Sequence, residues 1–460
     1  MKRIAYRAHW AVAAGVLALP LFAAGCDPKK ELLSPQQPGV ISPGDIQSGT
    51  GADALYVGAV GYLNTALNGS GNSNTESLWN WTGLFTDEFK SGDTFSQRND
   101  DDRRALQDND GVLTPIYRRV QQGRGHARTA INALLEFEPD QKSKIGEMYF
   151  VMGFLELSLG EYFCNGIPLG ETVDGVPQYT EPLTDQVVIQ TAIARFDTAL
   201  TYVGSASDAQ SKQVRNAVLV AKGRAQVDLG KFAEAAATVA GVPTGFQYSF
   251  TYSPSTVDNE WWILGPSVQR YSIGDSVDIS GPVLNAIPFA SLNDPRVPIF
   301  TTGRPGEDNQ TIFVWTHVLE GRDDPTPVVS GIDARLIEAE AKLQAADYAG
   351  MMKILNDLRT NPQTIGTFEV PTMPALSTVP ATKDAAINLF FREKALWQFG
   401  RGYRMDDLRR LVRQYQRAQD KVFPSGVFFK TGNYGDEVAF PVVDDEKTNP
   451  NFKGCIDRNA

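Results

Sequence analysis

Residues 331–359, GIDARLIEAEAKLQAADYAGMMKILNDLR, contain two helical patterns separated by a tight turn. The patterns cover 331–343 and 348–359, and the turn between them is Ala346-Asp347-Tyr348. A long helix, a turn through a small residue and a second, closely packed helix are typical of a tetratricopeptide-like hairpin. This stretch therefore predicts a scaffold of paired helices.

The same turn pattern occurs twice more, at Gly160-Glu161-Tyr162 and Gly230-Lys231-Phe232. Because the intervals are irregular, the chain is not predicted to be an array of equal repeats. Such turns also join helices in hairpins of other kinds, which is the alternative interpretation. We expect tetratricopeptide-like hairpins around 143–162, 212–240 and 331–359.

Residues 243–330 interrupt the helical patterns. Pro, Gly, Ser and Thr become more frequent there, and aromatic and β-branched residues cluster in short runs such as TIFVW at 311–315. Short runs of this kind favour irregular structure with short strands. We therefore expect a mainly α domain over 51–460 that carries an irregular, loop-rich insertion at about 243–330.

The chain begins with the three parts of a lipoprotein signal. Basic residues at the start are followed by an uncharged run over 10–24, and Ala23-Ala24-Gly25 precede Cys26. This pattern is typical of a secretory signal, and a Cys directly after the small residues favours lipidation. We expect a signal peptide at 1–25, a lipid on Cys26 and an extended tether over 26–50. An ordinary signal peptide followed by an unmodified Cys is the alternative.

Charge and histidine content exclude several classes of function. The net charge of −11 argues against binding to nucleic acid or anionic lipid headgroups. After the signal only His126 and His317 remain, and neither has a Cys or a second His at metal-ligand spacing. The sequence therefore predicts no metal site and no cofactor.

Two cysteines, Cys164 and Cys455, remain once Cys26 is set aside. An even pair in an exported protein favours a disulfide. Two free, buried thiols are the alternative. A disulfide here would join the middle of the chain to its last residues.

Two segments resemble motifs of the SusD/RagB family of outer-membrane nutrient-binding lipoproteins. Residues 333–341, DARLIEAEA, are similar to the family's Arg-Leu-x-x-Ala-Glu-Ala helix. Arg392-Glu393 and the later GYRMDDLRR at 402–410 are similar to its Arg-Glu…Gly-His-Arg…Asp-Leu-Arg-Arg signature, with Tyr403 where His is usual. Asn449-Pro450-Asn451 also resembles the family's C-terminal end.

The resemblance implies a SusD-like fold on a lipid-anchored protein of the outer membrane. It also implies that the protein hands a nutrient to a SusC-like TonB-dependent transporter. The alternative function is a helical-repeat scaffold lipoprotein that binds only protein partners.

Aromatic residues are the candidates for holding the nutrient, an oligosaccharide or a peptide. Carbohydrate binds where aromatic rings stack on sugar faces and nearby polar groups bond the hydroxyls. A position in the core is the alternative for each Trp. The candidate ligand-binding residues are Trp79, Trp81, Asp87, Trp261, Trp262 and Trp315.

No motif favours catalysis. Acidic pairs such as Asp406-Asp407 are frequent by chance in a chain with 54 acidic residues, and no phosphate loop or nucleophile elbow is present. The arginines of 401–413 are expected to pair with carboxylates and to orient packed elements. The sequence therefore predicts a binding protein that is not an enzyme.

Overall fold

The computed structural model describes residues 47–69, 71, 76–173 and 176–460. The predicted signal peptide, lipidated Cys26 and all but the end of the tether lie outside the described residues and stay predictions. No helix within the described ranges combines the length and the apolar character that crossing a membrane requires.

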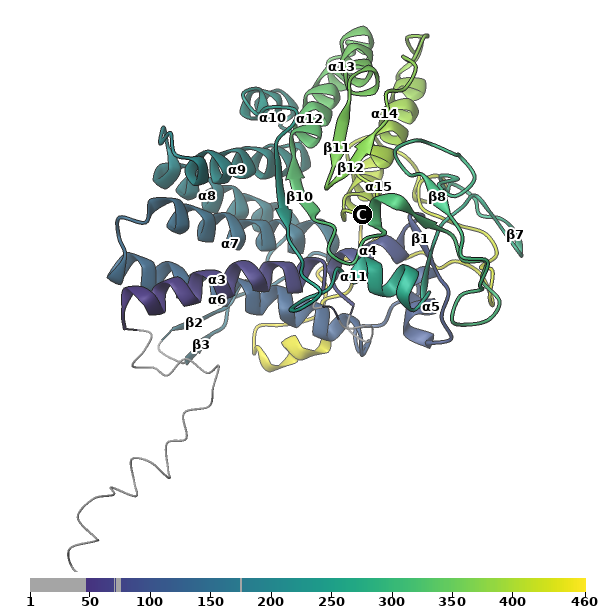
Figure 1. Ribbon diagram of the computed structural model, residues 1–460. Coiled ribbons are helices and arrows are strands. Elements are labelled where there is room, and N and C mark those ends of the chain that lie inside the picture. The colour runs from purple at the N-terminus through teal and green to yellow at the C-terminus, as the bar shows by residue number, and fades with distance from the viewer. Residues whose placement is uncertain (1–46, 70, 72–75, 174–175) are drawn as a thin grey trace, which may run out of the picture.

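Long helices stacked side by side form one half of the molecule (Figure 1). Each contacts its neighbours along the chain, and the stack runs from α3 and α6 at one end to α12 and α13 at the other. Because α7 is buried on nearly all faces, it lies in the middle of this layer. The helices are α3 (Gly49–Leu67), α6 (Leu113–Phe137), α7 (Lys142–Tyr162), α8 (Asp185–Val203), α9 (Ala209–Asp228), α10 (Phe232–Val239), α12 (Gly331–Gln344) and α13 (Tyr348–Thr360).

Two of the three expected hairpin turns are confirmed. α9 turns into α10 at Gly230 and α12 turns into α13 at Ala346, both with left-handed backbone (φ 74° and 56°). In each turn the next amide donates to a carbonyl five residues back, which caps the end of the helix. The shared sequence pattern thus reflects a shared capping geometry.

The prediction of a third turn at 160–162 is wrong. These residues form the last turn of α7, and the chain turns after Tyr162. A Cβ on Gly160 would lie 2.8 Å from Ile189 of α8, so the small residue permits close helix packing instead of a turn. Close packing and tight turns both select glycine, and the sequence pattern does not separate them.

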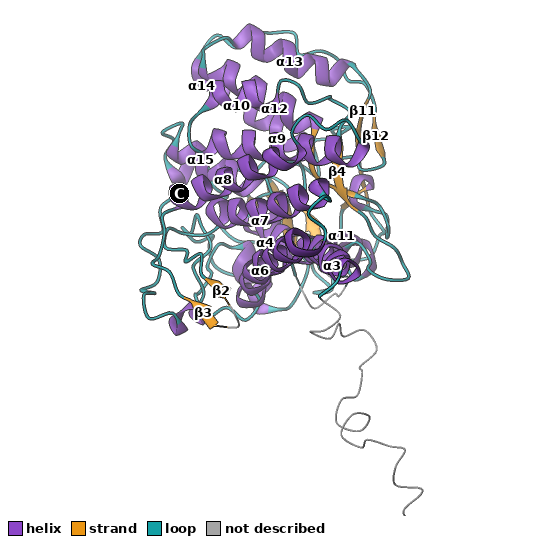
Figure 2. Ribbon diagram, turned by 90° about the vertical axis from the view of Figure 1, so that its left-hand side faces the viewer, coloured by secondary structure: helices purple, strands orange, loops and turns teal. Residues whose placement is uncertain are grey.

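The other half of the molecule is irregular, as expected for the insertion. β4 (Gln247–Phe250) pairs with β10 (Thr326–Ser330) in an antiparallel ladder. The first and last strands of the insertion therefore lie side by side. All sheets in the described part of the chain are two-stranded and antiparallel, and Figure 2 places the strands beside and between the helices. The remaining strands are β1 (Phe89–Ser91), β2 (Glu171–Val173), β3 (Val176–Gln178), β5 (Tyr271–Ile273), β6 (Val277–Asp278), β7 (Gly281–Pro282), β8 (Ile299–Phe300), β9 (Trp315–Thr316), β11 (Gln363–Ile365) and β12 (Phe368–Val370).

Shorter helices join the two halves. α15 packs on both α4 and α7, and α14 packs on α12. They are α4 (Leu78–Phe85), α5 (Ser96–Asp102), α11 (Glu260–Trp262), α14 (Lys383–Trp397) and α15 (Arg404–Arg413), with a π-helical turn at Ile263–Ser267 and short 3-10 turns at His317–Leu319, Gln419–Lys421 and Asp444–Thr448.

The predicted disulfide between Cys164 and Cys455 is present, with a Cα–Cα distance of 5.8 Å. It connects the segment after α7 to the C-terminal residues. Asn165 also bonds Asp457 across the same junction. The C-terminal segment is therefore fastened to the helical layer by a covalent bond and by hydrogen bonds.

Candidate ligand-binding groove

Four of the predicted aromatic residues lie in the core. The side chains of Trp79, Trp81, Trp261 and Trp315 have no exposed surface. Every residue of α4 is buried, so its two indoles have no solvent face to occupy. The expectation that these four residues line a ligand surface is therefore corrected.

The structure brings two of these indoles together around Phe89. Trp261 stacks on the Phe89 ring with centroids 4.5 Å apart, and Trp315 lies 5.5 Å from the same ring. Phe89 belongs to β1, whereas the two indoles come from the insertion. The aromatic residues thus attach the insertion to the rest of the molecule.

Asp87 is also structural. Its carboxylate accepts two hydrogen bonds from Arg404, at 2.7 and 2.9 Å, and one from the amide of Ile287 at 2.6 Å. The residue is 5% exposed. Its acceptor positions are therefore occupied by the protein itself, and the expectation that it contacts a ligand is corrected.

Trp262 is the one predicted aromatic residue that reaches the surface. It is half-buried, and the guanidinium of Arg322 lies 5.2 Å from its ring. Arg322 also pairs with Asp258 at 2.7 Å. Trp262 therefore remains a candidate ligand contact.

A separate groove of about 660 Å³ lies between α6 and the β2–β3 hairpin. Both ribbon views place this hairpin beside α6 (Figures 1 and 2). Tyr62 of α3 and the C-terminal residues Glu446 and Asn449 complete the wall. A volume of this size is within the range of small-molecule sites.

One polar face of α6 forms the floor of the groove. Arg118, Gln121, Gln122, Gly125 and Thr129 recur at helical spacing and all line it. A Cβ on Gly125 would meet no atom within 4 Å, so the floor is open above this residue. This recurrence in the sequence is the signal that could have located the groove.

Three rings offer planar surfaces in the groove. Tyr62 and His126 are in contact, with centroids 4.4 Å apart, and Tyr179 is 48% exposed. Burial lowers the pKa of His126, so its imidazole is neutral at pH 7. The rings can therefore stack on an uncharged ligand without bringing a cation to it.

The arginines of the groove are paired within the protein. Arg124 donates to Glu156 at 3.2 and 3.3 Å, and Arg128 forms a two-point contact with Glu171. Arg118 donates to Asp445 at 2.9 Å. The buried pair with Glu156 and the two-point contact with Glu171 hold Arg124 and Arg128 in place, whereas the pair of Arg118 and Asp445 is exposed to solvent.

The two carboxylates that line the groove are likewise engaged. Glu171 is held by Arg128, and Glu446 accepts a hydrogen bond from Tyr117 at 2.8 Å. Burial raises the pKa of Glu446. The lining therefore consists of rings, amides, hydroxyls and charged groups that have partners within the protein, which suits hydrogen bonding to a polyhydroxylated ligand.

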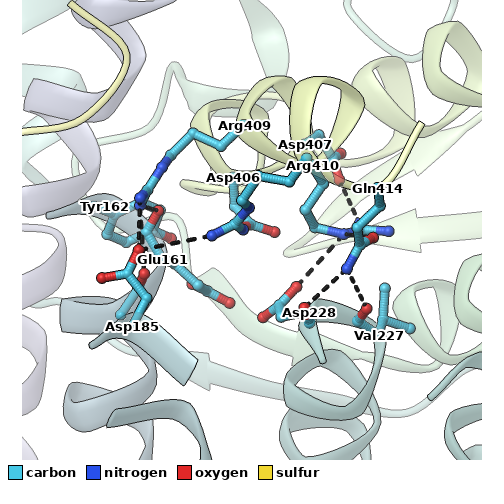
Figure 3. A network of polar contacts seen from close by, with 12 residues as sticks. Glu161, Tyr162, Asp185, Val227, Asp228, Asp406, Asp407, Arg409, Arg410 and Gln414 are labelled. Carbon is cyan, nitrogen blue, oxygen red and sulfur yellow. Dashed lines mark hydrogen bonds and ion pairs between the residues drawn. The ribbon is translucent and has the colours of Figure 1, made fainter. Parts of the chain in front are cut away.

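One buried acidic cluster has the spacing of metal ligands. Carboxylate oxygens of Glu161, Asp228 and Asp406 lie within 4.8 Å of one another, in the network of Figure 3. Each faces a guanidinium: Arg224 bonds Glu161 at 2.5 and 2.6 Å, Arg410 lies 3.6 Å from Asp228, and Arg413 lies 3.5 Å from Asp406. Arginine therefore supplies countercharge at this cluster, although Arg410 is shared with Asp407 and Glu340.

The arginines of the C-terminal signature pair with carboxylates, as expected. Arg409 bonds Asp185 at 2.7 Å and Arg410 bonds Glu340 (Figure 3 shows both arginines). The partners come from α8 and α12, so α15 is oriented by ion pairs to helices far away in sequence. The role of this motif in the structure is architectural.

No family model and no curated protein matches this chain. Its fold is similar to that of solved SusD-like proteins. For a surface glycan-binding protein A from Bacteroides uniformis the TM-score is 0.64 at 13% identity, covering 89% of this chain and 99% of that one. For a SusD-like carbohydrate-binding protein from Bacteroides vulgatus the TM-score is 0.63 at 13% identity, covering 88% of this chain and 97% of that one. For a laminarin-binding SusD-like protein the TM-score is 0.59 at 15% identity, covering 89% of this chain and 99% of that one. The SusD-like fold expected from the motifs is confirmed.

Proposed function

We propose that this protein binds an oligosaccharide in the groove between α6 and the β2–β3 hairpin and catalyses no reaction on it. The observation that carries the proposal is the lining of the groove, where the exposed ring of Tyr179 lies among amide and hydroxyl side chains. Apolar sugar faces stack on such rings and sugar hydroxyls bond such side chains. Two of the proteins with a similar fold, a surface glycan-binding protein and a laminarin-binding SusD-like protein, support this ligand class.

Calorimetric titration of the mature chain with a panel of oligosaccharides tests the proposal. Tyr179→Ala should weaken binding about 2- to 12-fold, because stacking on one ring contributes roughly 0.5–1.5 kcal/mol. Phe95→Ala is the matched control, since Phe95 is 42% exposed and does not line the groove. Trp262→Ala tests the competing location. If only Trp262→Ala weakens binding, the groove is the wrong site.

The absence of catalysis is tested with the same preparation. Any oligosaccharide that binds should be recovered unchanged after prolonged incubation. Release of a shorter product, abolished by Glu171→Gln or Glu446→Gln, would contradict the binding-only proposal.

We also propose that the protein is lipid-anchored through Cys26 and delivers its ligand to a SusC-like TonB-dependent transporter. The signal pattern and the family resemblance support both parts. A Cys26→Ser variant should lose metabolic labelling with palmitate and leave the outer-membrane fraction. Affinity purification of the anchored protein from that fraction should recover a large β-barrel partner. Failure to recover such a partner would contradict the delivery step.

A further inference from the structure

A second pocket, which shares no residue with the groove, lies where α14 and α15 meet the insertion. Its volume is about 350 Å³. Ile287 of the insertion, Phe391 of α14 and Leu411 of α15 supply an apolar floor. Figure 1 shows α14 at the upper right, away from α3 and α6, and α15 nearer the middle of the molecule.

The rim of this pocket is cationic. Arg392, Arg417 and Lys421 line it, and none of the described residues that line it is acidic. This is the opposite of the chain as a whole, whose net charge is −11. A local excess of positive charge in an acidic protein raises the local concentration of anions.

The rim cations are not neutralised by strong pairs. Arg392 is exposed and forms no hydrogen bond or ion pair with any residue in the described ranges. Lys421 lies 3.5 Å from Asp420, and both side chains are more than 70% exposed. Arg417, whose side chain is 23% exposed, donates to the neutral amide of Asn388 at 2.7 Å and lies 3.6 Å from Asp384, whose side chain is 89% exposed. Pairs in such contact with solvent are weak, so these cations can still bind an anion.

We infer that this pocket binds a small amphipathic carboxylate, with its apolar body on the floor and its carboxylate at the cationic rim. Guanidinium groups suit this ligand because their planar N–H donors match the two oxygens of a carboxylate. A neutral sugar would leave the rim charges unused and would place hydroxyls on an apolar floor, which is unfavourable. The inference is therefore independent of glycan binding in the groove.

Calorimetric titration of the mature chain with octanoate, and with octanamide as the uncharged isostere, tests the inference. Octanoate should bind at least about tenfold more tightly than octanamide, since two or three exposed charge contacts together contribute roughly 1–2 kcal/mol. Raising the salt concentration should weaken octanoate binding and leave octanamide unchanged.

The double substitution Arg392→Gln/Lys421→Gln should reduce the octanoate affinity roughly tenfold. Lys353→Gln/Lys447→Gln is the matched control, because it removes the same charge from exposed positions outside the pocket and should leave the affinity unchanged. No octanoate binding at millimolar concentration, equal binding of the amide, or equal loss in both double variants would each overturn the inference. Because all four residues are exposed, an unchanged melting temperature should accompany either result.

Discussion

At the scale of the residue, Ala346 carries avoidable backbone strain. Its φ of 56° is left-handed, a conformation that costs a residue with a Cβ about 1 kcal/mol, whereas the equivalent turn at 230 has glycine. We expect Ala346→Gly to raise the free energy of unfolding by about 0.5–1 kcal/mol, measured by urea denaturation. Ala345→Gly is the control: its φ is −77°, so that substitution should only add flexibility and destabilise. Stabilisation by both would contradict the strain argument.

Asp228 gives a second prediction at this scale. Burial, with the nearby carboxylates of Asp406 and Glu161, raises the pKa of Asp228 well above its usual value. Within the described residues no group donates a hydrogen bond to its two oxygens, and Arg410 at 3.6 Å is shared with Asp407 and Glu340. Folding must therefore either bury an incompletely compensated charge or take up a proton.

The sign of the resulting pH dependence follows. The unfolded carboxyl titrates near pH 4, and the folded one at higher pH, so this group makes the protein less stable as pH rises between the two values. Asp228→Asn removes this pH-dependent loss of stability. It should raise the free energy of unfolding at pH 7 by about 1–4 kcal/mol, and this increase should vanish near pH 4. Denaturant titrations from pH 4 to 8 measure the difference in the free energy of unfolding between the variant and the unchanged protein. Glu161→Gln, which leaves Arg224 without its carboxylate partner, should instead destabilise.

At the scale of the element, α11 holds neighbouring indoles with different roles. Trp261 is fully buried against Phe89, whereas Trp262 is half-buried beside Arg322. We expect Trp261→Ala to lower the free energy of unfolding by about 3–5 kcal/mol, because it leaves a large cavity at the contact with the insertion. Trp262→Ala, the adjacent control, should cost under about 1 kcal/mol. Comparable losses in thermal melting would mean that α11 presents no surface residue.

At the scale of the whole molecule, the disulfide closes most of the chain into a loop. Cys164 and Cys455 are separated by 291 positions. In the chain-entropy model a loop of this length stabilises the folded state by on the order of 5 kcal/mol. The double substitution Cys164→Ala/Cys455→Ala should therefore lower the melting temperature by several degrees, and a reducing agent should do the same to the unchanged protein. If the reductant affects the double variant equally, the disulfide is not the cause.

The sequence by itself determined the helical class, the loop-rich character of 243–330, two hairpin turns, the disulfide and the pairing of the signature arginines. These features depend on local periodicity, on turn chemistry or on the small number of cysteines, all of which are present in the chain before it folds. The motif resemblance also identified the fold.

Only the tertiary structure decided which polar and aromatic residues are buried and which line a groove. A Trp residue looks the same in the sequence whether its indole lies in the core or at a binding surface, because burial depends on what packs over it. Trp261 and Trp262 are neighbours, yet the first is fully buried and the second is half-buried. Gly160 shows the same limit, because the residue serves the packing of α8 on α7, and the local pattern at 160–162 contains no information on that contact. The groove on α6 forms only where the β2–β3 hairpin and the C-terminal residues meet that helix. Contacts between segments far apart in sequence create such surfaces, and no local pattern encodes them.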